Sequence, residues 1–256
     1  MQLAKPVQTL TSAPAHWSMN VLLSSLPPDD FQRVSGNLTW RPLKVRQVVH
    51  KHGEPIAEVY FPSRSVCSIT NAMEDGGMVE VATVGREGLV GIGAVLGNAV
   101  AAGDAFVQVA GDPAAVMGID AFTREMERGG AFHDAMTRYS QAFVSLLMQS
   151  VACNALHSAE QRCCRWLLMT HDRIQQDEFP LTHEFLAIML GVRRPTVTLV
   201  MAELTRAGIV SHVRGHVRIV DRRALEAASC ECYRNVRAVF DRLAPRGERL
   251  GAALVQ

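Results

Sequence analysis

The sequence predicts an α+β protein with three successive parts: an N-terminal antiparallel β-roll of jelly-roll type, a long helix, and a C-terminal winged helix-turn-helix. Three observations support this fold class. Short β-rich runs separated by turn residues extend from Leu38 to about Met117. A proline-free segment with helical periodicity follows, from about Asp120 to His157. The segment Leu181–Leu204 then has the pattern of two short helices joined by a tight turn.

Length and composition are those of a globular protein with room for two domains. The chain has 256 residues, of which 48% are hydrophobic and 20% are charged. Its longest apolar runs, Val144–Met148 and Leu186–Leu190, are much shorter than the roughly 20 residues that span a bilayer. The N-terminus also has no basic segment followed by an apolar core, as a secretory signal would. We therefore expect a cytoplasmic protein with no membrane contact.

The N-terminal half is expected to consist of a flexible arm over residues 1–15 and a β-roll domain over residues 16–120. The arm is rich in small and polar residues. Asn20–Leu26 is a short apolar stretch, and Pro27–Asp30 reads as a turn and helix start. Glu74–Gly77 is a strong turn signal between two strands. The predicted strands are Val45–His50, Glu58–Phe61, Val66–Thr70, Met78–Val84 and Phe106–Val109.

The long helix, assigned to residues 121–157, carries a heptad stripe. Along it, mainly apolar residues recur at alternating steps of four and three. Such regularity favours a parallel pairing with a second copy of the chain, and the alternative is packing against the helix's own domain. The predicted dimer-interface residues are Phe132, Met136, Tyr139, Phe143, Leu146, Ser150 and Cys153, with His157 ending the stripe.

The last domain, assigned to residues 158–256, starts with a helix expected over Ala159–Ile174 and contains the most informative segment. Thr182 is a plausible N-cap for a short helix. Gly191 stands where the chain must turn sharply, and Pro195 stands in the first turn of the next helix. This is the layout of a helix-turn-helix, whose second helix presents its N-terminal residues to the DNA major groove. The inward stripe of that helix is formed by Val197, Val200, Met201 and Leu204.

A basic hairpin follows and is predicted to be the wing. Ser211–Arg214, Gly215 and His216–Val220 form its strands and turn, and Asp221–Arg237 reads as a closing helix. Residues 158–256 hold 15 Lys and Arg against 11 Asp and Glu, whereas residues 1–157 hold 11 against 14. A basic C-terminal part is compatible with phosphate contact. The candidate DNA-contacting residues are Thr182, Arg193, Arg194, Thr196, Thr198 and Arg214.

This order of parts resembles the Crp/Fnr family of transcription regulators, from about Val21 to Val239. The resemblance rests on the helix-turn-helix and wing together with four short motifs. They are Val59-Tyr60-Phe61-Pro62, Val84-Gly85-Arg86-Glu87-Gly88, Gly191-Val192-Arg193-Arg194 and Cys230-Glu231-Cys232-Tyr233.

The resemblance implies a sensor domain shaped like a cyclic-nucleotide-binding domain, a dimerisation helix, and a winged helix that binds DNA. It implies a homodimer on palindromic double-stranded operators, with RNA polymerase and an unknown effector as further partners.

Cyclic-nucleotide binders of the family use a Gly-Glu pair and an Arg. Leu89–Leu96 has no Glu after its glycines, and Ala101–Phe106 has no Arg. Because a buried phosphate needs a paired cation, we do not expect cyclic-nucleotide binding.

No cofactor or metal is predicted from the sequence. Cys67 stands alone where iron–sulfur members carry a cysteine cluster, and His50 and His52, possible haem ligands, are expected to be solvated. The spacings Cys163-Cys164 and Cys230-x-Cys232 differ from a zinc knuckle, so the six cysteines are interpreted as reduced structural thiols.

Two other functions can be weighed against a DNA-binding regulator. One is a small-molecule or thiol-redox sensor in which the N-terminal domain or Cys153 controls DNA binding. The other is an enzyme, but the sequence has no nucleophile elbow, P-loop, dinucleotide fingerprint or H-E-x-x-H motif. We therefore expect no catalytic residues.

Overall fold

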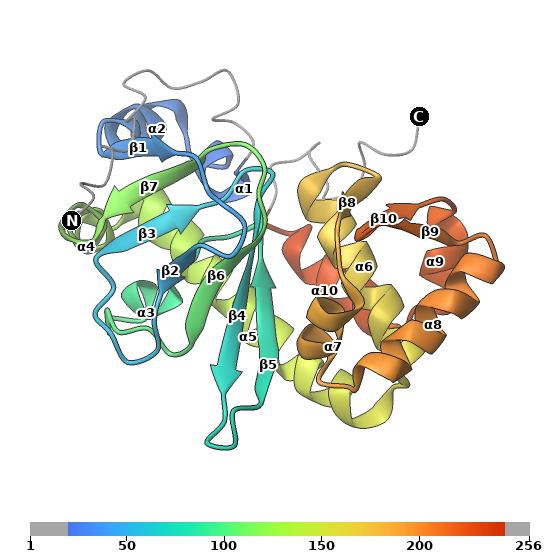
Figure 1. Ribbon diagram of the computed structural model, residues 1–256. Helices are drawn as coiled ribbons and strands as arrows, with labels where there is room; N and C mark the ends of the chain where they lie inside the picture. The colour runs from blue at the N-terminus through green and yellow to red at the C-terminus, as the bar shows by residue number, and fades with distance from the viewer. Residues whose placement is uncertain (1–19, 244–256) are drawn as a thin grey trace.

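Helix α5 (Gly130–Leu156) runs between two parts of the molecule in the computed structural model, which describes residues 20–243 (Figure 1). The N-terminal part, on the left of the view, is built mainly from strands. The C-terminal part, on the right, is built mainly from helices. The arm predicted over residues 1–15 lies outside the described residues.

Two antiparallel sheets form the N-terminal part, which confirms the predicted β-roll. One sheet has the order β1-β7-β3 and the other β2-β6-β4-β5. Their registers place Tyr60 opposite Val116 and Cys67 opposite Val84. Short helices α1 (Val21–Ser24), α2 (Pro28–Ser35) and α3 (Ile92–Val95) lie between or before the strands. The strands are β1 (Leu38–Arg41), β2 (Val48–His50), β3 (Glu58–Phe61), β4 (Val66–Ala72), β5 (Met78–Val84), β6 (Asp104–Val109) and β7 (Ala114–Gly118).

The sequence-based strand prediction missed β1 and β7 and began β2 too early. Strand β7 starts with two alanines, and its first four residues are all buried, so it shows no alternation of apolar and polar residues. The strand expected from Val45 starts instead at Val48. Arg46 has a φ of 67°, which breaks the extended conformation.

The long helix predicted over residues 120–157 is divided in two. Helix α4 (Ile119–Arg128) is separated from α5 by Gly129, and Gly130 is the first residue of α5; the φ angles of these two glycines are 74° and 76°. These positive angles stop a right-handed helix, and glycine adopts them without a Cβ clash. Helix α5 then packs against the β-roll, with Phe132 and Tyr139 fully buried.

The C-terminal part combines five helices with a small antiparallel sheet of order β8-β10-β9 in the described chain. Helix α6 has the predicted bounds and starts at a capping box, in which the Ser158 hydroxyl accepts from the Gln161 backbone N–H and the Gln161 side chain accepts from that of Ser158. The closing helix predicted over residues 221–237 is split at Ser229–Glu231. The elements are α6 (Ala159–Ile174), β8 (Glu178–Pro180), α7 (His183–Leu190), α8 (Arg194–Arg206), β9 (Val210–Val213), β10 (His216–Ile219), α9 (Arg222–Ala228) and α10 (Cys232–Phe240).

Among the described residues, no single helix is long and apolar enough to cross a membrane. One bent pair, α7 with α8, passes a test of length and composition only.

Candidate nucleic-acid interface

Helices α7 and α8 form a helix-turn-helix, with an angle of 109° between them. The Thr182 hydroxyl caps α7 by accepting from the Phe185 backbone N–H at 3.2 Å. Gly191 ends α7 in the left-handed conformation, at a φ of 61°. Pro195 lies in the first turn of α8, where a backbone N–H has no hydrogen-bond partner within the helix, so the N–H that proline lacks is not needed. The local signals in the sequence therefore form the expected motif.

Helix α8 has one buried face, formed by the four residues predicted to point inward. Around its N-terminus, Arg193, Arg194 and Thr198 are exposed, and Thr196 is half-buried. The Thr198 hydroxyl donates to the Arg194 carbonyl oxygen at 3.1 Å and lies 3.1 Å from Nδ1 of His183. Within residues 20–243, the guanidinium groups of Arg193 and Arg194 make no ion pair. Two free cations thus lie at the positive end of the α8 dipole, which is suited to an anionic partner.

The wing is a tight hairpin of β9 and β10, with Val213 opposite His216. Arg214 and Gly215 form its two-residue turn at φ angles of 50° and 79°, as a type I′ turn requires. The Arg214 side chain is exposed and has no ion-pair partner among the described residues. The backbone N–H of Leu181 donates to the Gly215 carbonyl oxygen at 2.8 Å, which fixes the wing beside the start of α7.

The predicted interface stripe of α5 is packed inside the protomer. The seven side chains from Phe132 to Cys153 in that stripe are all buried by residues of the same chain. Tyr139, for example, donates a hydrogen bond to the Leu89 carbonyl oxygen at 3.1 Å. An adjacent stripe is exposed instead: Val144, Met148 and Val151 are 47%, 70% and 72% accessible. The heptad periodicity correctly predicted a helix. The side chains of the predicted stripe, however, lie in the core of the protomer rather than on its surface.

A cavity of about 400 Å³ lies between the β-roll and α5. Its lining is largely apolar, and no Lys or Arg is among its lining residues in the described chain. His50, which the sequence analysis expected to be solvated, lines this cavity and lies 2.8 Å through Nε2 from the Glu58 carbonyl oxygen. Burial lowers the pKa of His50, so the ring is neutral at neutral pH. The polar lining residues are His50, Asn71, Glu80, Ser150 and Asn154.

Glu80 connects the cavity to the helix-turn-helix part. Nε1 of Trp166 in α6 donates to Oε1 of Glu80 at 2.9 Å. Burial raises the pKa of Glu80 to about 7. The Trp166 ring also packs edge-on against Phe185 of α7. One carboxyl group therefore lines the cavity and is also hydrogen-bonded to α6, whose Trp166 packs against α7.

A buried ion pair forms a second connection between the two parts. Nε of Arg173 in α6 donates to Oε1 of Glu87 at 2.8 Å, and both side chains are almost fully buried. The same guanidinium donates to the Thr83 carbonyl oxygen at 3.2 Å. A Cβ on Gly85 would lie 2.6 Å from the Arg173 side chain. The contact with Arg173 explains why the Val84–Gly88 motif has a glycine at position 85 and an acidic residue at position 87. The sequence analysis did not identify Arg173 as their partner.

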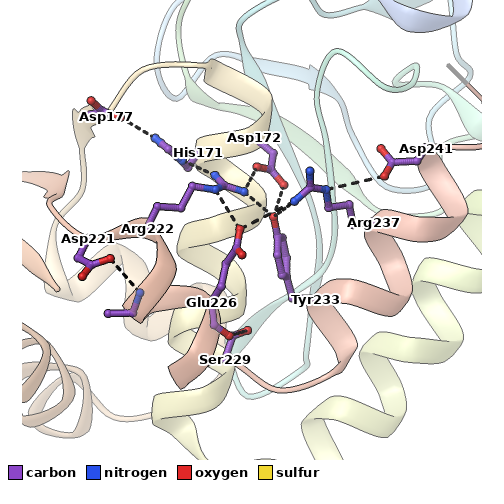
Figure 2. Close-up of polar contacts among 11 residues, drawn as sticks. His171, Asp172, Asp177, Asp221, Arg222, Glu226, Ser229, Tyr233, Arg237 and Asp241 are labelled. Atoms are coloured by element: carbon purple, nitrogen blue, oxygen red, sulfur yellow. Dashed lines mark hydrogen bonds and ion pairs between the residues drawn. The ribbon is translucent and has the colours of Figure 1, made fainter. Parts of the chain in front are cut away.

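Within the C-terminal part, a polar network fixes α9 and α10 on α6 (Figure 2). Arg222 donates to Oδ1 of Asp172 and to the Tyr233 hydroxyl, both at 2.6 Å, and to Glu226 at 3.0 Å. The Tyr233 hydroxyl donates to Oδ2 of Asp172 at 2.8 Å. The members of this network are largely buried, and each has a partner. The network therefore rigidifies the packing of α6, α9 and α10, and α8 packs against α6.

Comparison with known families identifies this part of the molecule. The family model of the Crp-like helix-turn-helix domain matches residues 161–228, from α6 to the end of α9. A search with the sequence finds no match among curated proteins.

Solved structures extend the likeness to the rest of the fold. A transcriptional regulator assigned to the Crp/Fnr family from Eubacterium rectale is 16% identical, with a TM-score of 0.58 over 81% of this chain and 96% of that one. FixK2 from Bradyrhizobium japonicum is 13% identical, with a TM-score of 0.57 over 75% and 98%. The c-di-GMP-responsive regulator CLP from Xanthomonas campestris is 15% identical, with a TM-score of 0.56 over 75% and 99%.

These findings agree with the resemblance seen in the sequence motifs. The structural matches establish the fold, and the family model identifies the helix-turn-helix domain within it. The chain therefore has the fold of Crp/Fnr proteins over most of its length and a Crp-like helix-turn-helix domain at residues 161–228.

Proposed function

We propose that the chain binds palindromic double-stranded DNA as a homodimer in the cytoplasm and regulates transcription there, with RNA polymerase as a further partner. The observation that carries this proposal is a set of three exposed guanidinium groups, those of Arg193, Arg194 and Arg214, which lie at the start of α8 and at the wing turn and make no ion pair within residues 20–243. Arg can donate two hydrogen bonds to a guanine edge or contact phosphate. Thr196 and Thr198 are the other candidates on α8, whereas the Thr182 hydroxyl is already engaged as a helix cap.

The exposed stripe of α5 supports pairing of two chains. Gln141, Val144, Met148, Val151 and Ala155 are exposed and follow steps of three and four. A two-fold pair of α5 helices would bury this stripe and present two recognition helices to half-sites about 34 Å apart. We accordingly propose residues 16–120 as the sensor domain, 121–157 as the dimerisation segment and 158–256 as the DNA-binding domain.

The cavity between the β-roll and α5 is the proposed effector site. Its lining is apolar and includes no cation from the described part of the chain, which favours a small, mainly apolar molecule over a cyclic nucleotide. Thiol control through Cys153 is less favoured, because its sulfur is buried within the protomer and cannot reach a second chain without rearrangement.

Selection of bound fragments from genomic DNA tests the proposal, first with protein alone and then with cell-extract metabolites. Enrichment of a two-fold symmetric sequence is expected, with affinity that falls steeply as salt rises. Arg194→Ala should weaken binding to that sequence by about 10- to 100-fold and relax preference at one position per half-site. Arg124→Ala, which removes an exposed cation from α4, is the matched control and should bind as the wild type does. Absence of any enriched sequence under both conditions would contradict the proposal.

A further inference from the structure

Three cysteines and one histidine from distant parts of the chain meet where α5 ends. Cys153 lies in the last turn of α5, and His157 follows that helix directly. Cys230 lies in the turn between α9 and α10, and Cys232 is the first residue of α10. The four ligand atoms all lie within 4.8 Å of one another. The three cysteines are buried, and the His157 side chain is only 15% exposed.

The spacing of these atoms matches tetrahedral metal coordination. A Zn²⁺ ion with Zn–S bonds of about 2.3 Å and a Zn–N bond of about 2.0 Å holds its sulfurs about 3.8 Å apart and each sulfur about 3.5 Å from the nitrogen. In this structure Sγ of Cys153 lies 3.6 Å from Sγ of Cys230. Sγ of Cys232 lies 3.5 Å from Nδ1 of His157. These two separations fit a tetrahedral site, and all four ligand atoms lie within 4.8 Å of one another.

Polar groups around the cluster orient His157 and Cys232 as metal ligands would be oriented. Nε2 of His157 lies 3.3 Å from the Glu231 carboxylate, which favours a proton on Nε2 and a free lone pair on Nδ1 toward the cysteines. Nε2 of Gln149 donates to Sγ of Cys232 at 3.0 Å, as donors to metal-bound thiolates do. A carboxylate behind a histidine ligand is a common feature of zinc sites.

Core packing does not account for this arrangement. Cys163 and Cys164 belong to the main hydrophobic core, whereas Cys153, Cys230 and Cys232 form a separate cluster. A disulfide between Cys153 and Cys230 would use two of the sulfurs and leave the approach of Cys232 to His157 unexplained. Iron–sulfur clusters are usually held by four thiolates, whereas a tetrahedral set of sulfur and nitrogen is typical of zinc.

We propose that Cys153, His157, Cys230 and Cys232 bind one zinc-class divalent cation in closed tetrahedral coordination. Four protein ligands leave no open position, so the ion is structural rather than catalytic. It joins the end of α5 to the turn between α9 and α10. The site therefore sets how the C-terminal part is held on the dimerisation helix, and its existence does not depend on the proposed DNA function.

Metal titration of the reduced, chelator-treated full chain tests this site, with folding followed by circular dichroism. We expect one Co²⁺ per chain, the visible bands of tetrahedral Co²⁺, a thiolate charge-transfer band in the near ultraviolet, and displacement by one Zn²⁺. Cys230→Ala should weaken binding at least 100-fold. Cys163→Ala removes a buried thiol outside the cluster and should bind as the wild type does.

A surface variant keeps the test valid if Cys230→Ala folds poorly. Glu231→Gln changes an exposed carboxylate and should weaken metal binding about 10-fold through His157. Glu160→Gln, another exposed carboxylate, should have no effect. A folded, reduced wild-type chain that binds no Co²⁺, or binds it without a thiolate band, would overturn the proposal. A Cys153–Cys230 disulfide in protein prepared from cells under thiol-trapping conditions would overturn it as well.

Discussion

The two faces of α5 differ in what they contact, although both carry apolar residues at heptad spacing. The inner face, which includes Phe132, Tyr139 and Leu146, is buried by the protomer's own β-roll and α10. The outer face, which includes Val144 and Met148, is open. The inner face carries three aromatic residues, Phe132, Tyr139 and Phe143, whereas the outer stripe has none. One helix thus supports the fold of the chain on one side and leaves an apolar stripe exposed on the other, which is the surface proposed to pair with a second chain.

The largest expected effect comes from the inner face. Phe132→Ala removes a buried ring that packs edge-on against Phe122 at 5.6 Å. The lost burial and the resulting cavity should lower the free energy of unfolding by about 4 kcal/mol. Urea unfolding at a fixed protein concentration measures this change. Asp134→Ala on the exposed side of α5 should change the value by less than about 0.5 kcal/mol, and equal effects of the two variants would refute the distinction between the faces.

A change on the outer face should act on association instead. Met148→Asp places a charge in the middle of the exposed stripe, where it would be buried between two α5 helices. We expect the dimer dissociation constant to rise at least 100-fold, with circular dichroism of the protomer unchanged. Sedimentation velocity over a range of concentrations measures it, with Thr123→Asp on the exposed side of α4 as the control. A Met148→Asp chain that remains dimeric at low concentration would show that the chains pair elsewhere.

The cavity is lined by residues of both stripes of α5, such as Ser150 and Val151, and by Glu80. Because the pKa of Glu80 is raised to about 7, the folded state binds a proton that the unfolded chain releases at its ordinary, lower pKa. The stabilising contribution of this group is present at low pH and is lost as the pH rises through about 7. Glu80→Gln cannot ionise, so the difference between wild type and variant should change by on the order of 2 kcal/mol between pH 5 and pH 8.

Unfolding measured across this pH range tests the assignment to Glu80. Glu54→Gln alters an exposed carboxylate and should give a pH profile parallel to the wild type. If the Glu80→Gln profile is also parallel, burial does not control the ionisation of Glu80.

The two faces of α5 and the helix-turn-helix differ in how well they could be predicted from the sequence. The helix-turn-helix was predicted well because its signals are local: a cap at Thr182, a left-handed Gly191 and an early Pro195. Periodicity predicted α5 as a helix, but it could not choose between two stripes that are offset by two residues along the chain. The choice depends on which side chains fill the space left by the β-roll, and that is a tertiary property.

Contacts between remote segments were the features that sequence reasoning missed. Cys153 and Cys230 are 77 positions apart, and Arg173 is 86 positions from Glu87. No local spacing joins such pairs, and no common metal-binding motif covers the Cys230-x-Cys232 turn. A single signal was available: Cys153 and His157 are four residues apart, so they share one helical face, as paired metal ligands often do.

The smallest expected effect concerns the connection between α5 and α6 at residues 157–158. Ser158 caps α6 through its hydroxyl, which accepts from the Gln161 backbone N–H at 3.2 Å. Ser158→Ala should lower the free energy of unfolding by about 1 kcal/mol without changing dimer dissociation, because the cap lies on neither face. Ser158→Asp should restore most of the loss, since a carboxylate caps the same N–H and also favours the positive end of the helix dipole. Urea unfolding and sedimentation of the two variants test both statements. A dissociation constant that shifts with Ser158→Ala would mean that this connection, rather than the stripe alone, sets how two chains meet.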